Sequence, residues 1–126
     1  MTLGVHEHTD MGFLTLLLQD GSGGLEVKPR GSEEWIAAPP VPRTFVVNIG
    51  DMLELWTHGI YQATLHRVEN PAPHDRLSFP YFFDPSWHCP LERDSPSIVT
   101  SMGTGTSPSR HDPQICLLYT SPSPRD

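Results

Sequence analysis

Two histidines and an aspartate have the residue types and the spacing of a metal-binding set. His8 and Asp10 are two residues apart, so at the end of an extended strand both side chains project to the same side and can hold one ion. His66 lies in another strand-like run, Ala63–Val68, and can supply a second imidazole. Two imidazoles and one carboxylate leave three positions of an octahedral Fe(II) ion open on one side. The set therefore predicts an iron site that can also bind O2 and a chelating molecule.

Arg76 and Ser78 form a second polar pair with a different chemistry. They are two residues apart on a strand-like run, so we expect both side chains on one face of the strand. A guanidinium beside a hydroxyl in the interior of a β-protein is costly unless an anion binds there. Arginine binds a carboxylate through two parallel charge-assisted hydrogen bonds. The pair therefore predicts a binding position for a dicarboxylate molecule.

Each of these signals is weak when taken alone, because seven histidines in 126 residues make an accidental His-x-Asp plausible. A single histidine on a strand is also more often a hydrogen-bonded structural residue than a ligand. His6 lies two residues before His8, and a His6/His8 pair with another carboxylate is an alternative ligand set. The remaining histidines fall in turns or loops and are predicted to be solvated: His58, His74, His88 and His111.

Other residues that could do chemistry have structural interpretations. Asp51 and Glu54 could form an acid/base pair, but their place directly after a strand suits a turn and a helix cap. Four further residues could line a pocket, although the sequence does not separate that role from core packing: Phe13, Thr15, Trp56 and Phe82. No catalytic residue is predicted beyond the metal ligands.

The elements that must position these residues are predicted to be mainly β-strands. Short runs rich in β-branched, aromatic and other apolar residues recur at intervals of roughly eight to twelve positions, a rhythm typical of a sandwich or barrel. The expected strands cover residues 3–8, 13–19, 24–28, 34–38, 45–49, 62–69 and 76–83. Gly21–Gly24 is predicted to close a hairpin. One short helix is expected over Asp51–His58, capped by Asp51 and ended by Gly59.

The C-terminal end of the chain has a different composition. Residues 95–115 are rich in Ser, Thr, Gly and Pro and cannot bury enough apolar area to offset the entropy of ordering, so we expect irregular structure there. Residues 116–126 resemble the in-frame translation of an adapter used in sequencing libraries and are expected to be non-native. The functional core is therefore assigned to residues 1–94.

Charge and cysteine content argue against several classes of protein. The formal net charge is −7 and the eight Lys and Arg residues are scattered, which argues against a nucleic-acid partner. No apolar run approaches the roughly 20 residues needed to cross a bilayer, so no membrane partner is expected. Cys89 and Cys116 are too few for a disulfide framework and lack the spacing of a zinc site, which favours a reducing, cytoplasmic location. The sequence predicts no particular oligomeric state.

Taken together, the pattern resembles a known family. His8-Thr9-Asp10, then His66, then Arg76-Leu77-Ser78, in this order on strand-like runs, resembles the isopenicillin N synthase-like branch of the 2-oxoglutarate/Fe(II) oxygenases. The resemblance extends from about residue 4 to residue 90. It includes the runs HTDMGFLTLL at 8–17, GGLEV at 23–27, FVVNIGDMLE at 45–54 and FFDP at 82–85.

The resemblance implies a double-stranded β-helix, or jelly roll, with iron in its mouth. It matches His8, Asp10 and His66 to the iron ligands, and it matches Arg76 and Ser78 to the pair that binds the distal carboxylate of 2-oxoglutarate. The implied reaction uses O2 to oxidise a small organic substrate by hydroxylation, desaturation or cyclisation, with succinate and CO2 as co-products. The alternative is a non-catalytic β-sandwich fragment that binds a metal or a partner.

The chain also departs from the family's pattern. The helices and the first β-helix strand that open the family's catalytic domain have no counterpart here, so we expect a β-helix that is incomplete on its N-terminal side. Pro42-Arg43-Thr44 stands where the family usually has Pro-Gly-Thr, and His58 stands where Asn is common. An arginine in a turn that favours positive φ would cost about 1 kcal/mol, so a different turn is expected at Arg43.

Overall fold

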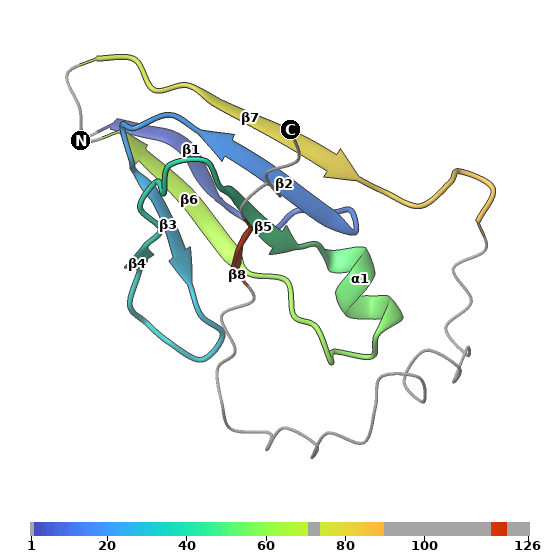
Figure 1. The fold of residues 1–126 in the computed structure, drawn as a ribbon. Coiled ribbons are helices and arrows are strands. Elements are labelled where there is room, and N and C mark those ends of the chain that lie inside the picture. Colours follow the sequence, from blue (N-terminus) through green and yellow to red (C-terminus); the bar gives the residue numbers. More distant parts are fainter. Residues whose placement is uncertain (1, 71–73, 90–116, 121–126) are drawn as a thin grey trace.

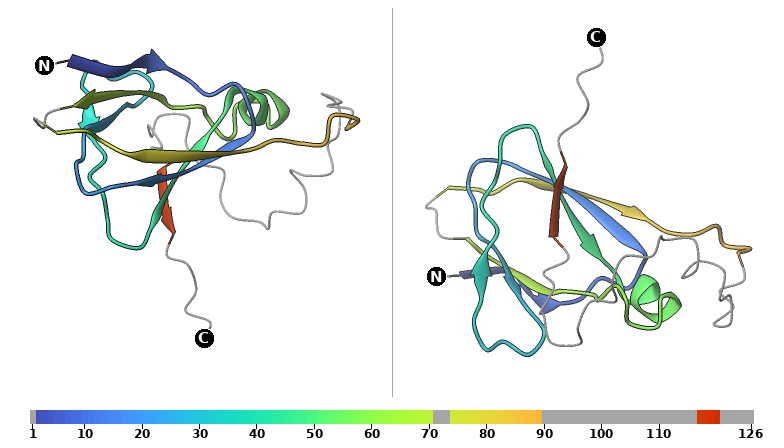
Figure 2. Two further views of the ribbon diagram at one scale, coloured as in Figure 1. Left: turned by 90° about the horizontal axis from the view of Figure 1, so that it is seen from above. Right: turned by 60° about the horizontal axis from the view of Figure 1, so that its bottom comes forward.

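Two four-stranded antiparallel sheets lie face to face in the computed structural model, which describes residues 2–70, 74–89 and 117–120 (Figure 1). The first sheet has the order β1 (Thr2–His8), β6 (Leu65–Asn70), β3 (Leu25–Lys28), β4 (Ile36–Ala37). The second has the order β7 (Ser78–Phe83), β2 (Leu14–Gln19), β5 (Phe45–Ile49), β8 (Leu117–Thr120). Figure 2 shows the sheets as two layers with the chain passing between them.

The chain crosses repeatedly from one sheet to the other, which is the path of a jelly roll, and the predicted fold class is confirmed. The seven strands expected before residue 84 are all present, most of them shortened at their ends. The hairpin expected at Gly21–Gly24 is wrong, because β2 and β3 belong to opposite sheets. Gly23 and Gly24 do have positive φ, but they serve a crossover, where Asp20 Oδ1 accepts a hydrogen bond from the Ser22 amide. Turn-forming residues alone did not distinguish these two connections.

Strand β8 was not expected from the sequence. Its four residues pair antiparallel with β5, the outer strand that would otherwise end this sheet. An unpaired strand edge offers backbone donors and acceptors to any extended apolar segment, so the run Leu117–Tyr119 has the composition to pair there. The expected irregular segment 95–115 lies outside the described residues. The non-native origin of residues 116–126 remains a prediction.

A small hydrophobic core fills part of the space between the sheets. Side chains alternate along each strand, and those that face the other sheet are mostly small and apolar. The buried cluster consists of Leu25, Val27, Ala38, Val46 and Val68, with Leu17 packed against it. Because these side chains are few and small, room for a cavity remains between the sheets.

The single helix of the described residues, α1 (Asp51–Trp56), follows β5 directly. Its N-cap is Gly50, which makes no side-chain capping bond, so the prediction that Asp51 caps the helix is wrong. The first backbone N–H groups of α1 are instead satisfied by carbonyl groups of the loop that follows β1. The helix ends near residue 57, and Gly59 beyond it has the positive φ that was expected of a terminating glycine. No helix in the described part of the chain is long and apolar enough to cross a membrane.

The turn at Arg43 keeps a left-handed conformation, so the expectation of a different turn is wrong. Arg43 has a φ of 59° and His58 a φ of 52°, the two positions at which the sequence departs from the residues typical of the family. Thr44 Oγ1 donates to the Val41 carbonyl at 2.9 Å across the first of these turns. Left-handed backbone at a non-glycine residue costs about 1 kcal/mol or more, which the surrounding fold offsets at both sites.

Candidate metal centre and carboxylate pocket

His8 and His66 are brought together by strand pairing. The two residues are direct partners in the antiparallel β1–β6 ladder, and their ring centroids are 4.3 Å apart. The register slips between Val5 and His8, so that these residues, three apart in sequence, both line the same cavity. A bulge of this kind re-aims side chains near a functional site. Pairing and bulge together direct both imidazoles into the space between the sheets.

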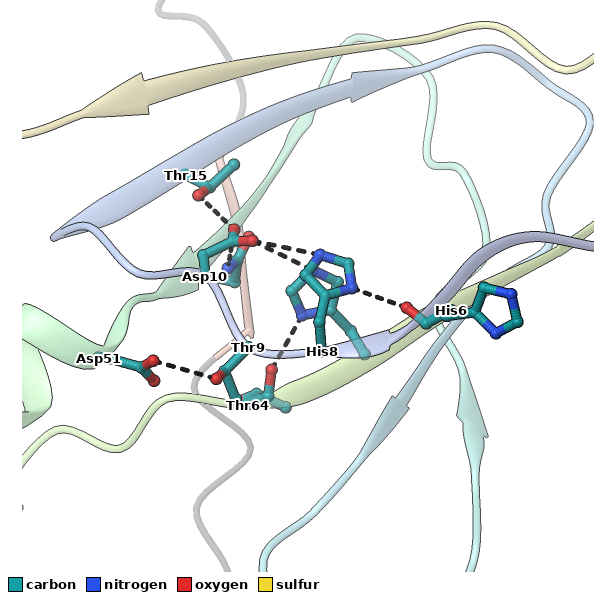
Figure 3. A network of polar contacts seen from close by, with 9 residues as sticks. His6, His8, Thr9, Asp10, Thr15, Asp51 and Thr64 are labelled. Carbon is teal, nitrogen blue, oxygen red and sulfur yellow. Dashed lines mark hydrogen bonds and ion pairs between the residues drawn. The ribbon is translucent and has the colours of Figure 1, made fainter.

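Asp10 lies just beyond β1 and divides its two carboxylate oxygens between two tasks (Figure 3). Its Oδ1 lies 3.4 Å from His8 Nε2 and 3.6 Å from His66 Nε2. Its Oδ2 accepts hydrogen bonds from Thr15 Oγ1 on β2 and from Asn48 Nδ2 on β5, the latter at 2.8 Å. The second sheet therefore holds one oxygen of Asp10 while the other faces the imidazoles.

The imidazoles are oriented by backbone carbonyl groups. His8 Nδ1 lies 2.8 Å from the His6 carbonyl oxygen, and His66 Nδ1 lies 2.9 Å from that of Thr64. A hydrogen bond from Nδ1–H fixes the tautomer and leaves the Nε2 lone pair available to a metal. The His6 ring is directed away from the cluster in Figure 3 and does not belong to it, which removes the alternative His6/His8 ligand set.

The three side chains fit a divalent metal of the type that the sequence predicted. One ligand atom from each of His8, Asp10 and His66 lies within 4.8 Å of the others, and no other such group occurs among the described residues. Asp10 and His66 are largely buried, with side chains 10% and 14% exposed, whereas His8 is 41% exposed. The cluster is therefore embedded in the protein at Asp10 and His66 and open to solvent at His8.

The pKa of Asp10 is lowered despite its partial burial. Burial alone would raise the pKa of this carboxyl group, but the hydrogen bonds from Asn48 and Thr15 and the nearby His66 and His8 outweigh it. The result is a carboxylate that is ionised at neutral pH without a bound cation, as a metal ligand must be.

Helix α1 and its N-cap hold the loop that carries Asp10. The amides of Gly50, Asp51 and Met52 donate to carbonyl groups of the loop over residues 10–13. Thr9 Oγ1 also donates to the Asp51 carboxylate at 3.2 Å. The loop and the N-cap approach so closely that a Cβ atom on Gly50 would lie 2.1 Å from the Gly12 carbonyl oxygen. Glycine at position 50 is therefore required by space.

A cavity of about 210 Å³ connects the metal cluster to Arg76 and Ser78. Its wall between these polar ends is mostly apolar and is shared with the hydrophobic core. Of the four residues named above as possible pocket residues, Thr15 and Phe82 line the cavity. The other two, Phe13 and Trp56, pack against each other as tilted rings with centroids 5.2 Å apart and do not line it.

Arg76 lies at the second polar end of the cavity with only neutral partners. Its Nε donates to the Gly23 carbonyl at 2.6 Å, and its terminal nitrogens donate to Ser78 Oγ at 3.0 Å and to Gln19 Oε1 at 3.1 Å. Burial lowers the pKa of Arg76, and Asp20 partly offsets this effect. By contrast, Arg30 and Arg67 both form ion pairs with glutamates. Among the described residues, Arg76 is thus a half-buried cation without a carboxylate in ion-pair distance.

Glu54 has a structural role, as expected, but it does not cap the helix. Glu54 accepts hydrogen bonds from Arg30 at 2.6 Å and from the Ala63 amide at 2.7 Å, which ties α1 to the segment before β6. His58, His74 and His88 are exposed, as predicted. His111 lies outside the described residues.

Two residues of the site were not identified from the sequence. Asn48 is a buried amide within the apolar strand β5, and Gln19 ends the apolar strand β2. Both are polar residues at inward positions of apolar strands, and a buried polar group needs a hydrogen-bond partner. This pattern could have identified them in the sequence. Their partners, Asp10 and Arg76, lie 38 and 57 residues away in sequence, so local pattern could not identify them.

Comparisons with known proteins agree with this architecture. A 1-aminocyclopropane-1-carboxylate oxidase from Dictyostelium discoideum is 56% identical over 84 residues, which cover 66% of this chain and 23% of that protein. Homoarginine-6-hydroxylase 2-ODD-233 from Oryza sativa subsp. japonica is 50% identical over 90 residues, covering 71% and 27%. The crystal structure of a full-length Neurospora crassa protein in complex with alpha-KG and thymine superposes with a TM-score of 0.61 at 42% identity, covering 68% and 27%.

The chain thus spans about a quarter of the length of the relatives that it matches. Residues 1–85, which the family model matches, include strands β1 to β7 and every residue that lines the cavity. The sequence model of the 2OG-Fe(II) oxygenase superfamily matches residues 1–85, which is more than half of the chain. The chain belongs to the 2OG-Fe(II) oxygenase superfamily.

Proposed function

We propose that this chain is the catalytic core of an oxygenase that uses Fe(II), 2-oxoglutarate and O2 to oxidise a small organic molecule. The observation that carries the proposal is the pairing of two sites in one cavity. A cluster of two imidazoles and a carboxylate lies at one end, and an arginine that forms no ion pair with any described residue lies at the other. The first site suits the ion, and the second suits a carboxylate of the co-substrate.

His8, Asp10 and His66 would hold the iron. Backbone carbonyl groups bind Nδ1 of both imidazoles, and the second sheet binds Oδ2 of Asp10. The two Nε2 atoms and Oδ1 therefore remain to bind the ion. Bound Fe(II) would supply the redox chemistry by which O2 is activated. The protein's own part is to keep three ligands on one side of the ion and to leave the other side accessible.

Arg76 and Ser78 would bind the distal carboxylate of 2-oxoglutarate. Three of the five N–H groups of Arg76 are used by Gly23, Ser78 and Gln19, which leaves one on each terminal nitrogen for the two oxygens of a carboxylate. The apolar wall between the two ends suits the methylene groups of the co-substrate and excludes water from them. Orientation of this molecule toward the metal ligands is the main catalytic task of the cavity.

The relatives support a small organic substrate without identifying it. One relative is named for 1-aminocyclopropane-1-carboxylate and one for homoarginine, and the Neurospora crassa protein is described in complex with thymine. We propose a substrate of this size class, oxidised by hydroxylation, desaturation or cyclisation. The cytoplasmic location likewise remains a prediction. No observation favours the alternative of a non-catalytic β-sandwich that binds a metal or a partner.

The proposal is tested by succinate formation. The purified chain, given Fe(II), 2-oxoglutarate, O2 and ascorbate as the reductant in place of the substrate, is expected to form succinate, and His66→Ala is expected to abolish this product because it removes a ligand of the ion. His6→Ala is the matched control and should retain the activity, since the His6 ring lies outside the cluster. Undiminished succinate formation by His66→Ala would contradict the proposed function.

A further inference from the structure

Gln19 lies behind Arg76 and does not itself line the cavity. It is the last residue of β2 and the direct cross-strand partner of Ser78 on β7. Inward positions alternate along β2, so Gln19 follows Thr15 and Leu17, both of which line the cavity, on the same face. Strand pairing thus places Gln19 beside both members of the Arg76–Ser78 pair.

Both ends of the Gln19 amide are engaged. Its Nε2 donates to the Ala38 carbonyl at 3.3 Å, and its Oε1 accepts from Arg76 at 3.1 Å. Because the Ala38 carbonyl can only accept, the amide nitrogen must face Ala38 and the amide oxygen must face Arg76. The contact also ties the second sheet to the segment that follows β4 of the first. Gln19 therefore fixes the Arg76 guanidinium relative to both sheets.

The neutrality of Gln19 matters as much as its geometry. The three acceptors that the described part of the chain places around Arg76 are uncharged, so none of them neutralises the guanidinium. Asp20, the neighbouring acid, directs its carboxylate oxygens to the amides of Ser22 and Leu77 instead. The positive charge of Arg76 consequently remains available to an anion that enters the cavity.

We propose that Gln19 is a positioning residue for co-substrate binding, which holds the Arg76 guanidinium in place through a neutral acceptor and so preserves its charge for the distal carboxylate of 2-oxoglutarate. This inference rests on the proposed function. It makes a prediction that a merely structural role does not make. A glutamate at position 19 would still accept from Arg76, yet it would neutralise the guanidinium and repel the incoming carboxylate.

The test compares Gln19→Glu and Gln19→Met by anaerobic calorimetric titration of the Fe(II)-loaded chain. Gln19→Glu should raise the Kd for 2-oxoglutarate by at least about tenfold, and Gln19→Met, which removes the acceptor without adding charge, should raise it by about two- to fivefold. The affinity for 2-oxopentanoate, which has a methyl group in place of the distal carboxylate, should be unchanged in both variants. Gln62→Glu makes the same charge change outside the cavity and should bind like the unsubstituted chain.

The outcomes separate this inference from the proposed function. If Gln19→Glu binds 2-oxoglutarate as tightly as the unsubstituted chain, Gln19 has only a structural role and the inference is overturned. Equal losses for 2-oxoglutarate and 2-oxopentanoate overturn it as well, because the effect then does not act through the distal carboxylate. If Gln19→Glu does not fold, the Kd values of Gln19→Met for 2-oxoglutarate and 2-oxopentanoate are compared instead, and an unchanged Kd for 2-oxoglutarate overturns the inference. An unsubstituted chain that binds Fe(II) but not 2-oxoglutarate overturns the proposed function and this inference with it.

Discussion

At the scale of single residues, the site depends on how each polar atom is shared between protein and ligand. Asp10 shows this most clearly, because Thr15 and Asn48 hold one oxygen while the other faces two imidazoles. Without these donors the carboxylate could rotate, and its other oxygen would no longer be held toward the two imidazoles. Loss of a partner that orients a metal ligand typically lowers metal affinity by about 10- to 100-fold.

Replacement of Asn48 by leucine tests whether its hydrogen bond orients Asp10 for the ion. The variant keeps the approximate volume of the side chain but removes its donor to Asp10 Oδ2. We expect the affinity for Fe(II) to fall by about 10- to 100-fold, measured by anaerobic calorimetry. Asn70→Leu, at the far end of β6, is the control and should leave the affinity unchanged. Equal affinities in the two variants would contradict a role for Asn48 in orienting Asp10.

At the scale of elements, a short helix positions the loop that carries Asp10. The N–H groups at the start of α1 bind carbonyl groups of residues 10–13, and no side chain caps the helix. This arrangement requires the two backbones to be in near contact at Gly12 and Gly50. The helix therefore contributes to the site through its backbone, which is why it needs no capping side chain from Asp51.

The close approach predicts a specific sensitivity at Gly50. Its φ of −99° is accessible to alanine, so Gly50→Ala has no conformational penalty and its cost is steric. The added Cβ would displace the Gly12 carbonyl and with it the Asp10 loop. We expect the free energy of unfolding in urea to fall by about 1–3 kcal/mol, with weaker Fe(II) binding.

Gly21→Ala is the matched control for this experiment. A Cβ atom at Gly21 would meet nothing within 4 Å, and this glycine does not have a positive φ. Its substitution should therefore leave stability and iron affinity close to those of the unsubstituted chain. If Gly50→Ala is no less stable than Gly21→Ala, the loop and the helix do not depend on this contact.

At the scale of the whole molecule, the hydrophobic core and the ligand cavity share their side chains. Leu25, Val27, Val46 and Val68 are buried in the core cluster and also line the cavity. The same side chains between the two sheets therefore pack against one another in the core and form part of the cavity wall. Changes in core volume should consequently alter co-substrate binding before they alter the fold.

Val46→Phe tests this sharing of side chains. The larger ring would occupy part of a cavity of about 210 Å³, so we expect the affinity for 2-oxoglutarate to fall by at least about tenfold while Fe(II) binding persists. Val47→Phe adds the same volume on the other face of β5, outside the cavity, and serves as control. Both variants are titrated calorimetrically with Fe(II) and with 2-oxoglutarate. Similar effects of the two substitutions would indicate general damage to β5.

The sequence predicted local features of this molecule better than long-range ones. The strands followed from apolar runs separated by turn residues, and the grouping of His8, Asp10 and His66 followed from spacing, residue type and the resemblance to the family. The crossover at Gly21–Gly24 was missed because turn residues do not record which sheet the next strand joins. Asn48 and Gln19 were not identified from the sequence, because strand register places them beside Asp10 and Arg76, and the whole fold determines that register.

The most direct test of the proposed function is an anaerobic titration of the Fe(II)-loaded chain with 2-oxoglutarate, followed by the visible absorbance that arises when a 2-oxo acid chelates the bound ion. We predict a saturable band for the unsubstituted chain and no band for His66→Ala, which lacks a metal ligand. For Arg76→Met we predict a half-saturation concentration at least about tenfold higher, with iron retained. A chain that binds one Fe(II) without producing the band, or an unchanged titration for Arg76→Met, would contradict the proposed function.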